Sequence, residues 1–253
     1  VVGPAAAALL NAVGGFRTPF WVMAILLTLL IPTAWRARPD TAPKDTQRRG
    51  PTDLFHNQRL IGAFFIVAAY FVFIGAFESI WVLEMDHRGA DQWQIGVSIT
   101  VAALPISILA PWGGVLAQRY GARRWAVGMV ATCAVFSTLF GLVEGIMSLV
   151  VLTIACSCAE GIGFPSTPML VSAAVPEDRQ AAAQGLASAI EVGVAAVAAL
   201  GLAAIYEAAG DTVAWIVAGV TMAVLLIIGW NLTKESDDDA AEMVQLTDPG
   251  NDS

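Results

Sequence analysis

Seven apolar segments, each long enough to cross a lipid bilayer, follow one another along this chain of 253 residues. A transmembrane helix needs about 20 predominantly apolar residues, because each residue adds about 1.5 Å to its length. The composition agrees, since 13% of the residues are charged, whereas an average soluble domain has about 25%. The sequence therefore excludes an ordinary soluble enzyme and predicts an all-α, polytopic bundle of transmembrane helices. The expected helices cover residues 19–35, 60–83, 94–112, 125–143, 148–172, 183–206 and 213–232.

The basic residues gather on one side of the predicted membrane. Residues 36–59, 113–124 and 173–182 lie on the same side as the C-terminal tail, and together they hold eleven of the thirteen lysines and arginines. The opposite side holds only Arg17 and Arg88. Positive residues are enriched in cytoplasmic connections. We therefore expect a multi-pass protein of the cell membrane (inner or plasma), with the linker 36–59 and the tail in the cytoplasm.

Three acidic residues lie inside the apolar segments: Glu78, Glu160 and Glu191. A charge at the centre of a bilayer costs at least about 2.5–3.5 kcal/mol, so such a residue usually faces a bundle interior or a water-filled cavity. It commonly marks the path of an ion or a substrate. All three are therefore candidates for proton coupling or substrate binding. For Glu191, an interhelical hydrogen bond is an equal alternative.

Glu160 is the strongest candidate because its segment also holds Gly161, Gly163, Pro165 and Pro168, which interrupt the helical hydrogen bonds. Broken helices occur at membrane depth where they line a cavity or are buried in protein. The alternative is a protonated Glu160 that is bonded to a neighbouring helix. Function and simple structure both stay open for this residue.

An aromatic stripe lies close to Glu78, with Tyr70, Phe73, Phe77 and Trp81 at helical spacing. This stripe suits an apolar or aromatic ligand, and Tyr70 is its candidate polar contact. Lipid contact or core packing is the commoner cause of such a stripe.

Small residues in the segment 183–206 indicate close helix packing. Gly185, Gly193 and Gly201 recur every eight residues, a little over two helical turns. Small residues let helix backbones approach closely in lipid. The stripe is therefore either a static contact or a seam against which another helical bundle moves.

The remaining patterns exclude several functions. The sequence has no P-loop, HExxH or GxSxG motif, so we expect no enzyme activity, no catalytic residue, no metal site and no cofactor. The tail 233–253 is acidic and no basic stripe is present, which excludes nucleic-acid binding. We expect this tail to be disordered.

The connection 113–124 carries a recognisable motif. It reads Gly-Gly-Val-Leu-Ala-Gln-Arg-Tyr-Gly-Ala-Arg-Arg and resembles the loop signature G-x-L-A-D-R-x-G-R-R of the major facilitator superfamily. In that family the signature joins helices 2 and 3 and recurs between helices 8 and 9. Gln118 stands here in place of the signature's acid. The resemblance makes five residues candidates for a cytoplasmic gating loop: Gly114, Arg119, Gly121, Arg123 and Arg124.

The resemblance also implies a domain organisation. Residues 60–232 correspond to the C-terminal six-helix bundle, and the linker 36–59 corresponds to the central cytoplasmic loop. Residues 1–35 would be helix 6 and part of helix 5, so we expect a fragment that lacks the preceding N-terminal helices. Gly3 and Pro4 resemble a remnant of the helix-5 packing motif of the family's antiporters.

The function implied by the resemblance is secondary active transport by alternating access. Helices 7 and 10 of the family face the central cavity, which would place Tyr70, Glu78 and Glu160 there. The expected activity is proton-coupled export of amphipathic small molecules, as in the antiporters of multidrug efflux. Its partners would be the bilayer, protons, a small-molecule substrate and the missing N-terminal helices. The alternatives are a proton-linked importer of a metabolite, such as a sugar or organic acid, and a seven-helix receptor or sensor.

Overall fold

The computed structural model describes residue 10, residues 14–15, residues 17–36 and residues 51–247. The chain forms two compact units, residues 1–49 and residues 50–253. In the first unit the structure describes one regular helix, α2 (Thr18–Arg36), with Pro32 in its last turns. Gly3 and Pro4, and most of the linker 36–59, lie outside the described residues.

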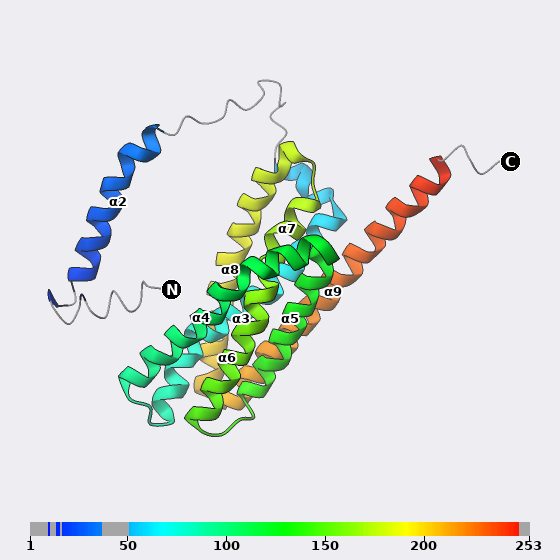
Figure 1. Ribbon diagram of the computed structural model, residues 1–253. Coiled ribbons are helices and arrows are strands. Elements are labelled where there is room, and N and C mark those ends of the chain that lie inside the picture. Colours follow the sequence, from blue (N-terminus) through cyan, green and yellow to red (C-terminus); the bar gives the residue numbers. More distant parts are fainter. Residues whose placement is uncertain (1–9, 11–13, 16, 37–50, 248–253) are drawn as a thin grey trace. The chain divides into compact units, whose positions relative to one another are not determined.

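The second unit is a bundle of helices joined by short connections (Figure 1). The central helix is α3, which packs most extensively against α8 and α9, while α4 packs against α6 and α5 packs against α9. The described part of the chain contains no β-strand, so the all-α prediction is confirmed. The elements are η1 (Pro51–His56), α3 (Gln58–His87), α4 (Gln92–Tyr120), α5 (Ala122–Phe140), α6 (Ile146–Gly163), α7 (Ser166–Ala173), η2 (Glu177–Arg179), α8 (Gln180–Ala209) and α9 (Asp211–Thr247).

Local sequence explains where α3 begins. Asn57 precedes α3, and its side-chain oxygen accepts a 3.1 Å hydrogen bond from the backbone N–H of Leu60. The same side chain donates a 2.7 Å bond to the carbonyl of Ala174, at the end of α7. Capping satisfies a backbone N–H that a helix start leaves without a partner. Asn57 therefore both starts α3 and fastens it to α7.

Five helical stretches in the described residues are long and apolar enough to cross a membrane: Gln58–His87, Trp93–Tyr120, Ile146–Ala173, Glu177–Ala209 and Asp211–Lys234. In α2 the apolar part is shorter, Thr18–Pro32. The expected segment 125–143 corresponds to α5, which is not among the five. It has 19 residues, begins with Ala-Arg-Arg and is rich in small and hydroxyl residues, which lowers its hydrophobicity.

The C-terminal tail needs a correction. We expected disorder over 233–253, but α9 continues through Thr247. No glycine or proline lies between Trp230 and Asp248, and those two residues are the strongest helix breakers. Alanine, glutamate and methionine in this stretch favour helix, so the acidic residues extend the last transmembrane helix.

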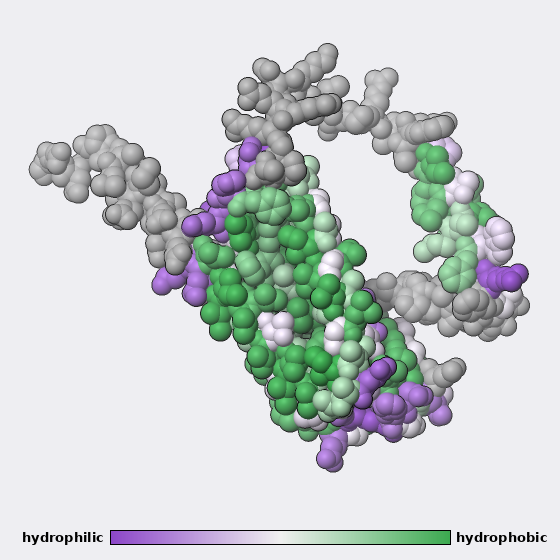
Figure 2. Space-filling view, turned by 180° about the vertical axis from the view of Figure 1, so that it is seen from behind, coloured by the Kyte–Doolittle hydropathy of each residue, from purple (hydrophilic) through white to green (hydrophobic). Residues whose placement is uncertain are grey.

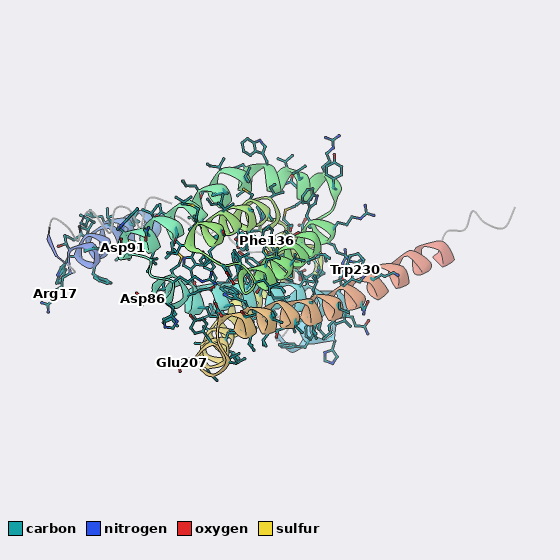
Figure 3. The ribbon with its side chains drawn as sticks, turned by 90° about the horizontal axis from the view of Figure 1, so that it is seen from below. Arg17, Asp86, Asp91, Phe136, Glu207 and Trp230 are labelled. Atoms are coloured by element: carbon teal, nitrogen blue, oxygen red, sulfur yellow. The ribbon has the colours of Figure 1, made fainter. Side chains whose placement is uncertain are left out.

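The outer surface of the second unit is largely apolar. Figure 2 shows hydrophobic residues over the middle of one face and hydrophilic residues at its ends. Large apolar side chains such as Trp112, Val135, Leu200 and Ile227 are exposed. A soluble protein rarely exposes so continuous an apolar surface, whereas a lipid environment requires one. Asp86, Asp91 and Glu207 lie at one end of the bundle, and Trp230 lies toward the other (Figure 3).

Candidate functional site

The bundle interior holds a carboxyl group that is bonded to a phenol. The Tyr70 hydroxyl lies 2.7 Å from Oε1 of Glu160, and both side chains are buried. Tyr70 comes from α3 and Glu160 comes from α6, so the hydrogen bond joins the two helices. The ring of Phe164 lies 5.6 Å from the Tyr70 ring, between centroids, so Tyr70 also has an aromatic neighbour. The structure therefore brings together two of the predicted candidates.

The helix that carries Glu160 is broken just beyond it. The backbone N–H of Phe164 still donates a 2.7 Å bond to the Glu160 carbonyl, but α6 ends at Gly163 and α7 begins at Ser166. Pro168 cannot donate to the carbonyl of Phe164. The backbone N–H and hydroxyl of Thr167 donate to that carbonyl instead, at 3.1 and 2.9 Å. The prediction of an interrupted helix at this point is thus confirmed.

The glycines around Glu160 have a different role from the expected one. A Cβ atom on Gly161 would lie 2.7 Å from the carbonyl oxygen of Pro105, and one on Gly113 would collide with the carbonyl of Ile162. These glycines therefore let α4 and α6 approach backbone to backbone. The helix stays regular as far as Gly163, so packing rather than interruption explains Gly161.

A small cavity of about 180 Å³ lies beside the carboxyl group. Among the described residues that line it, Glu160 is the only acidic one. Phe73 and Phe77 contribute the aromatic part of the wall, while Thr153 and Ser157 contribute hydroxyl groups. The cavity is thus a mainly apolar space with one carboxylic acid, which suits a small apolar or amphipathic group with a polar or cationic end.

The other two predicted acids are not part of this group. Glu78 is exposed on α3, and Glu191 is half-buried on α8. Neither contacts the Tyr70–Glu160 pair. Phe77 stacks on Trp81 with ring centroids 4.9 Å apart, and Trp81 is buried. The aromatic stripe therefore serves largely as core packing, with Phe73 and Phe77 also reaching the cavity wall.

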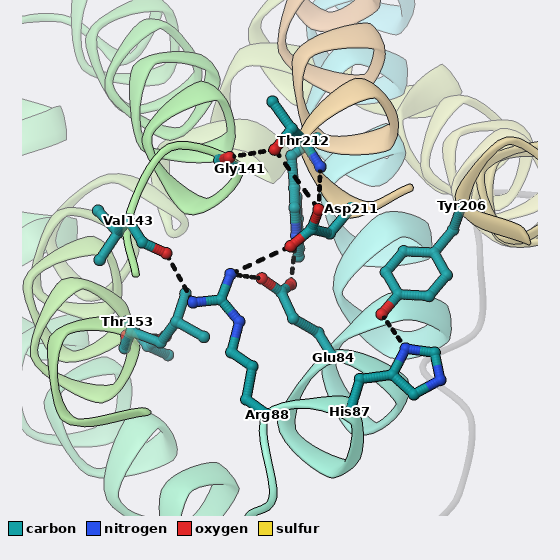
Figure 4. Close-up of polar contacts among 11 residues, drawn as sticks. Glu84, His87, Arg88, Gly141, Val143, Thr153, Tyr206, Asp211 and Thr212 are labelled. Atoms are coloured by element: carbon teal, nitrogen blue, oxygen red, sulfur yellow. Dashed lines mark hydrogen bonds and ion pairs between the residues drawn. The ribbon is translucent and has the colours of Figure 1, made fainter. Parts of the chain in front are cut away.

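A second polar cluster, which the sequence analysis missed, lies at the end of the bundle where α3 ends (Figure 4). Nη2 of Arg88 lies 2.6 Å from Oε1 of Glu84 and 3.2 Å from Oδ2 of Asp211. Nη1 of Arg88 donates a 2.6 Å bond to the carbonyl of Val143, and the indole N–H of Trp215 donates to the second oxygen of Glu84. The cluster joins α3, the α5–α6 connection and α9.

Glu84 was missed because the segment 60–83 was expected to end before it. The helix in fact continues to His87, and Glu84 is 1% exposed. The spacing of Glu84 and Arg88 was an available signal, since opposite charges four residues apart on a helix attract each other. Next to this cluster, Nδ1 of His87 lies 2.8 Å from the hydroxyl of Tyr206.

The predicted gating loop forms a tight turn between α4 and α5. Gly121 has a φ of 96°, which favours glycine. The guanidinium of Arg123 lies 4.3 Å from the centroid of the Trp230 ring and donates a 3.1 Å bond to the Trp230 carbonyl. Arg119 lies over the ring of Tyr120, at 5.5 Å from its centroid, and Arg124 is exposed. Arg123 therefore fastens the start of α5 to α9.

The glycine stripe of α8 is not packed against the rest of the described chain. Gly185, Gly193 and Gly201 are exposed, and a Cβ atom on any of them would meet nothing within 4 Å. Close glycine contacts lie elsewhere in the bundle. On α3, for example, a Cβ atom at Gly75 would collide with the carbonyl of Ala195 on α8. Gly114 in the gating loop resembles the α8 glycines instead, because a Cβ atom there would meet nothing within 4 Å.

Comparison with known proteins identifies the family. Residues 59–243, which span α3 to α9 except for the first residue of α3 and the last turn of α9, match the model of the family described as Major Facilitator Superfamily. No curated protein matches the chain. Among the described residues, no group of three or more His, Cys, Asp or Glu side chains is arranged to hold a metal ion. The chain thus belongs to the major facilitator superfamily, a family of secondary transporters rather than of enzymes.

Proposed function

We propose that this transporter exports amphipathic small molecules in exchange for protons, with Glu160 as the group that binds both in turn. The observation that carries the proposal is the buried carboxyl group of Glu160, which is bonded to Tyr70 and borders a mainly apolar cavity. A buried acid at membrane depth is a costly feature that usually serves ion or substrate transport.

The chemistry of the coupling follows from competition. A proton neutralises Glu160, whereas the polar or cationic end of a substrate needs the ionised carboxylate. When two ligands compete for one group, the binding of each lowers the affinity for the other. If the two ligands enter from opposite sides as the bundle alternates, release of the proton on one side permits binding of the substrate there.

Tyr70 holds the carboxyl group in place during this exchange. Its hydroxyl donates to an ionised Glu160, which needs hydrogen-bond donors in an apolar interior. The predominance of lysine and arginine on one side supports a cell membrane location, with the linker 36–59 and the C-terminal end in the cytoplasm. The bilayer, protons and a second helical bundle that faces α8 would complete the working transporter.

The experiment is transport of a fluorescent amphipathic cation, ethidium, across proteoliposomes that carry a pH gradient. We expect the Glu160→Gln variant to lose the gradient-driven movement while its yield and membrane insertion stay normal. The matched control is Glu144→Gln, which changes an exposed acid in the α5–α6 connection. Gradient-driven ethidium movement that is equal in Glu160→Gln and in the wild type would refute the role of this residue.

A further inference from the structure

An open groove runs along the arginine-rich end of the bundle, apart from the Glu160 cavity. Its volume is about 460 Å³, and α4, α5 and α6 all contribute to its walls. Residues Ala159, Ile162 and Gly163 of α6 border this groove, whereas Cys156, Ser157 and Glu160 border the Glu160 cavity. The two spaces therefore lie on different faces of α6, and the groove has no part in the proposed proton exchange.

The mouth of the groove carries a cation that the described chain leaves without a partner. Arg124 lines the groove and is exposed. Its neighbour Arg123 is engaged with the ring and carbonyl of Trp230. Tyr120 and Trp125 flank Arg124 in the groove wall. Such aromatic residues are enriched where the hydrocarbon core of a bilayer meets the lipid headgroups.

The floor of the groove is apolar and hollow. Gly128 and Met129 of α5 face Ala159 and Ile162 of α6 along it. A Cβ atom on Gly128 would meet nothing within 4 Å, so the absence of a side chain there leaves real space. From Arg124 to Thr132, the far end of the α5 wall, the helix rises about 12 Å. This length accommodates the upper part of a lipid acyl chain below a headgroup.

We propose that this groove binds one anionic phospholipid, with its phosphate on Arg124 and one acyl chain along Gly128, Met129 and Ile162. The charge of Arg124 complements the lipid phosphate. The flanking aromatic rings suit the boundary between headgroup and hydrocarbon, and the apolar floor suits the acyl chain. Arginine binds phosphate through a planar pair of N–H donors. Basic pockets between transmembrane helices on the cytoplasmic side are suited to anionic headgroups. A free phosphate ion would use only the mouth and leave the apolar floor empty.

The test is native mass spectrometry of the purified chain in detergent, with phosphatidylglycerol or phosphatidylcholine that have identical acyl chains. We expect the wild type to retain one phosphatidylglycerol in preference to phosphatidylcholine. Arg124→Gln should lower phosphatidylglycerol retention about fivefold, the effect of one basic residue at a membrane surface. Arg119→Gln is the matched control, because Arg119 is an exposed arginine of the same loop that does not line the groove.

A second variant tests the acyl-chain part. Gly128→Leu should fill the floor and lower the retention of both lipids, whereas Gly96→Leu, at another exposed helical glycine with open space, should not. The proposal is overturned if the wild type shows no preference, if Arg119→Gln and Arg124→Gln lose binding equally, or if Gly128→Leu retains both lipids normally. Displacement of phosphatidylglycerol by inorganic phosphate alone would show a simple anion site and also overturn it.

Discussion

The hydroxyl of Tyr70 and the carboxyl group of Glu160 form a 2.7 Å hydrogen bond between α3 and α6, in the buried interior of the bundle. The two residues are 90 positions apart in the chain. This hydrogen bond holds the carboxyl group at the wall of the cavity, one turn before α6 is broken.

Removal of the Tyr70 hydroxyl should destabilise the bundle. In Tyr70→Phe the buried Glu160 loses its donor, and a buried polar group that loses its partner costs about 1–3 kcal/mol. Thermal unfolding in detergent measures the loss. Tyr120→Phe is the control, since Tyr120 is exposed. Equal melting temperatures for the wild type, Tyr70→Phe and Tyr120→Phe would show that the hydrogen bond contributes nothing to stability.

The Arg88 cluster should contribute more to the stability of the bundle than the Tyr70–Glu160 hydrogen bond does. Arg88→Ala leaves Glu84 buried without its cation, and the loss of one partner of a buried ion pair costs about 3–5 kcal/mol. Because the side chain of Arg88 is 17% exposed, we expect the lower end of this range. Asp211→Asn should cost less, since Asp211 is 40% exposed and lies 3.2 Å from Arg88.

A double-mutant cycle on Glu84 and Arg88 separates their mutual attraction from their other contacts. We expect the double variant Glu84→Gln, Arg88→Ala to be more stable than the sum of the two single losses predicts, because it leaves no unpaired buried charge. Simple additivity of the two losses in thermal unfolding would contradict the ion pair.

Two adjacent glycines of the gating loop motif should respond differently to alanine. Gly113 faces the backbone of α6, so Gly113→Ala forces α4 and α6 apart at a cost of about 1–3 kcal/mol. Gly114 faces open space, so Gly114→Ala should keep the stability of the wild type or raise it slightly. The measurement is thermal unfolding of the two variants side by side. The prediction fails if Gly114→Ala is the less stable of the two.

The glycines of α8 and α3 offer a parallel comparison. Gly193→Ala should raise the free energy of unfolding by up to about 1 kcal/mol, because alanine favours helix and has space there. Gly75→Ala should lower it by about 1–3 kcal/mol through its contact with Ala195. Chemical denaturation in mixed micelles measures both. A clear loss of stability in Gly193→Ala would show that the stripe is packed.

The sequence predicts the helical architecture well because lipid imposes a single strong constraint on it. All seven expected segments are helical, and five of them, with 148–172 broken into α6 and α7, correspond to stretches long and apolar enough to span. The expected ends of α4 and α9 are wrong, since these helices continue to Tyr120 and Thr247. The helix α5 is not among the stretches apolar enough to span, because its first turn holds two arginines and its remainder holds several small and hydroxyl residues. The helical tail through Thr247 was missed because acidity suggested solvation, while helix propensity extended α9.

The candidate site was predictable only in part. Glu160 is visible from the sequence because a carboxyl group in an apolar run is costly, but its bond to Tyr70 depends on how α3 and α6 are rotated. Helix rotation also decides which glycines lie in close helix contacts. The period of Gly185, Gly193 and Gly201 is regular, yet the close contacts fall on other glycines, among them Gly75, Gly113 and Gly161. Spacing along one helix does not show which helix faces it.

The most direct test of the account is whether substrate and proton compete for Glu160. Ethidium is added to the detergent-solubilised protein in weakly buffered medium, and the pH is followed with an indicator dye. The account predicts that ethidium binding releases a proton from the wild type and from Glu144→Gln, and that Glu160→Gln releases none. Release of the same amount of acid from Glu160→Gln, or ethidium binding to the wild type without any proton release, would contradict it.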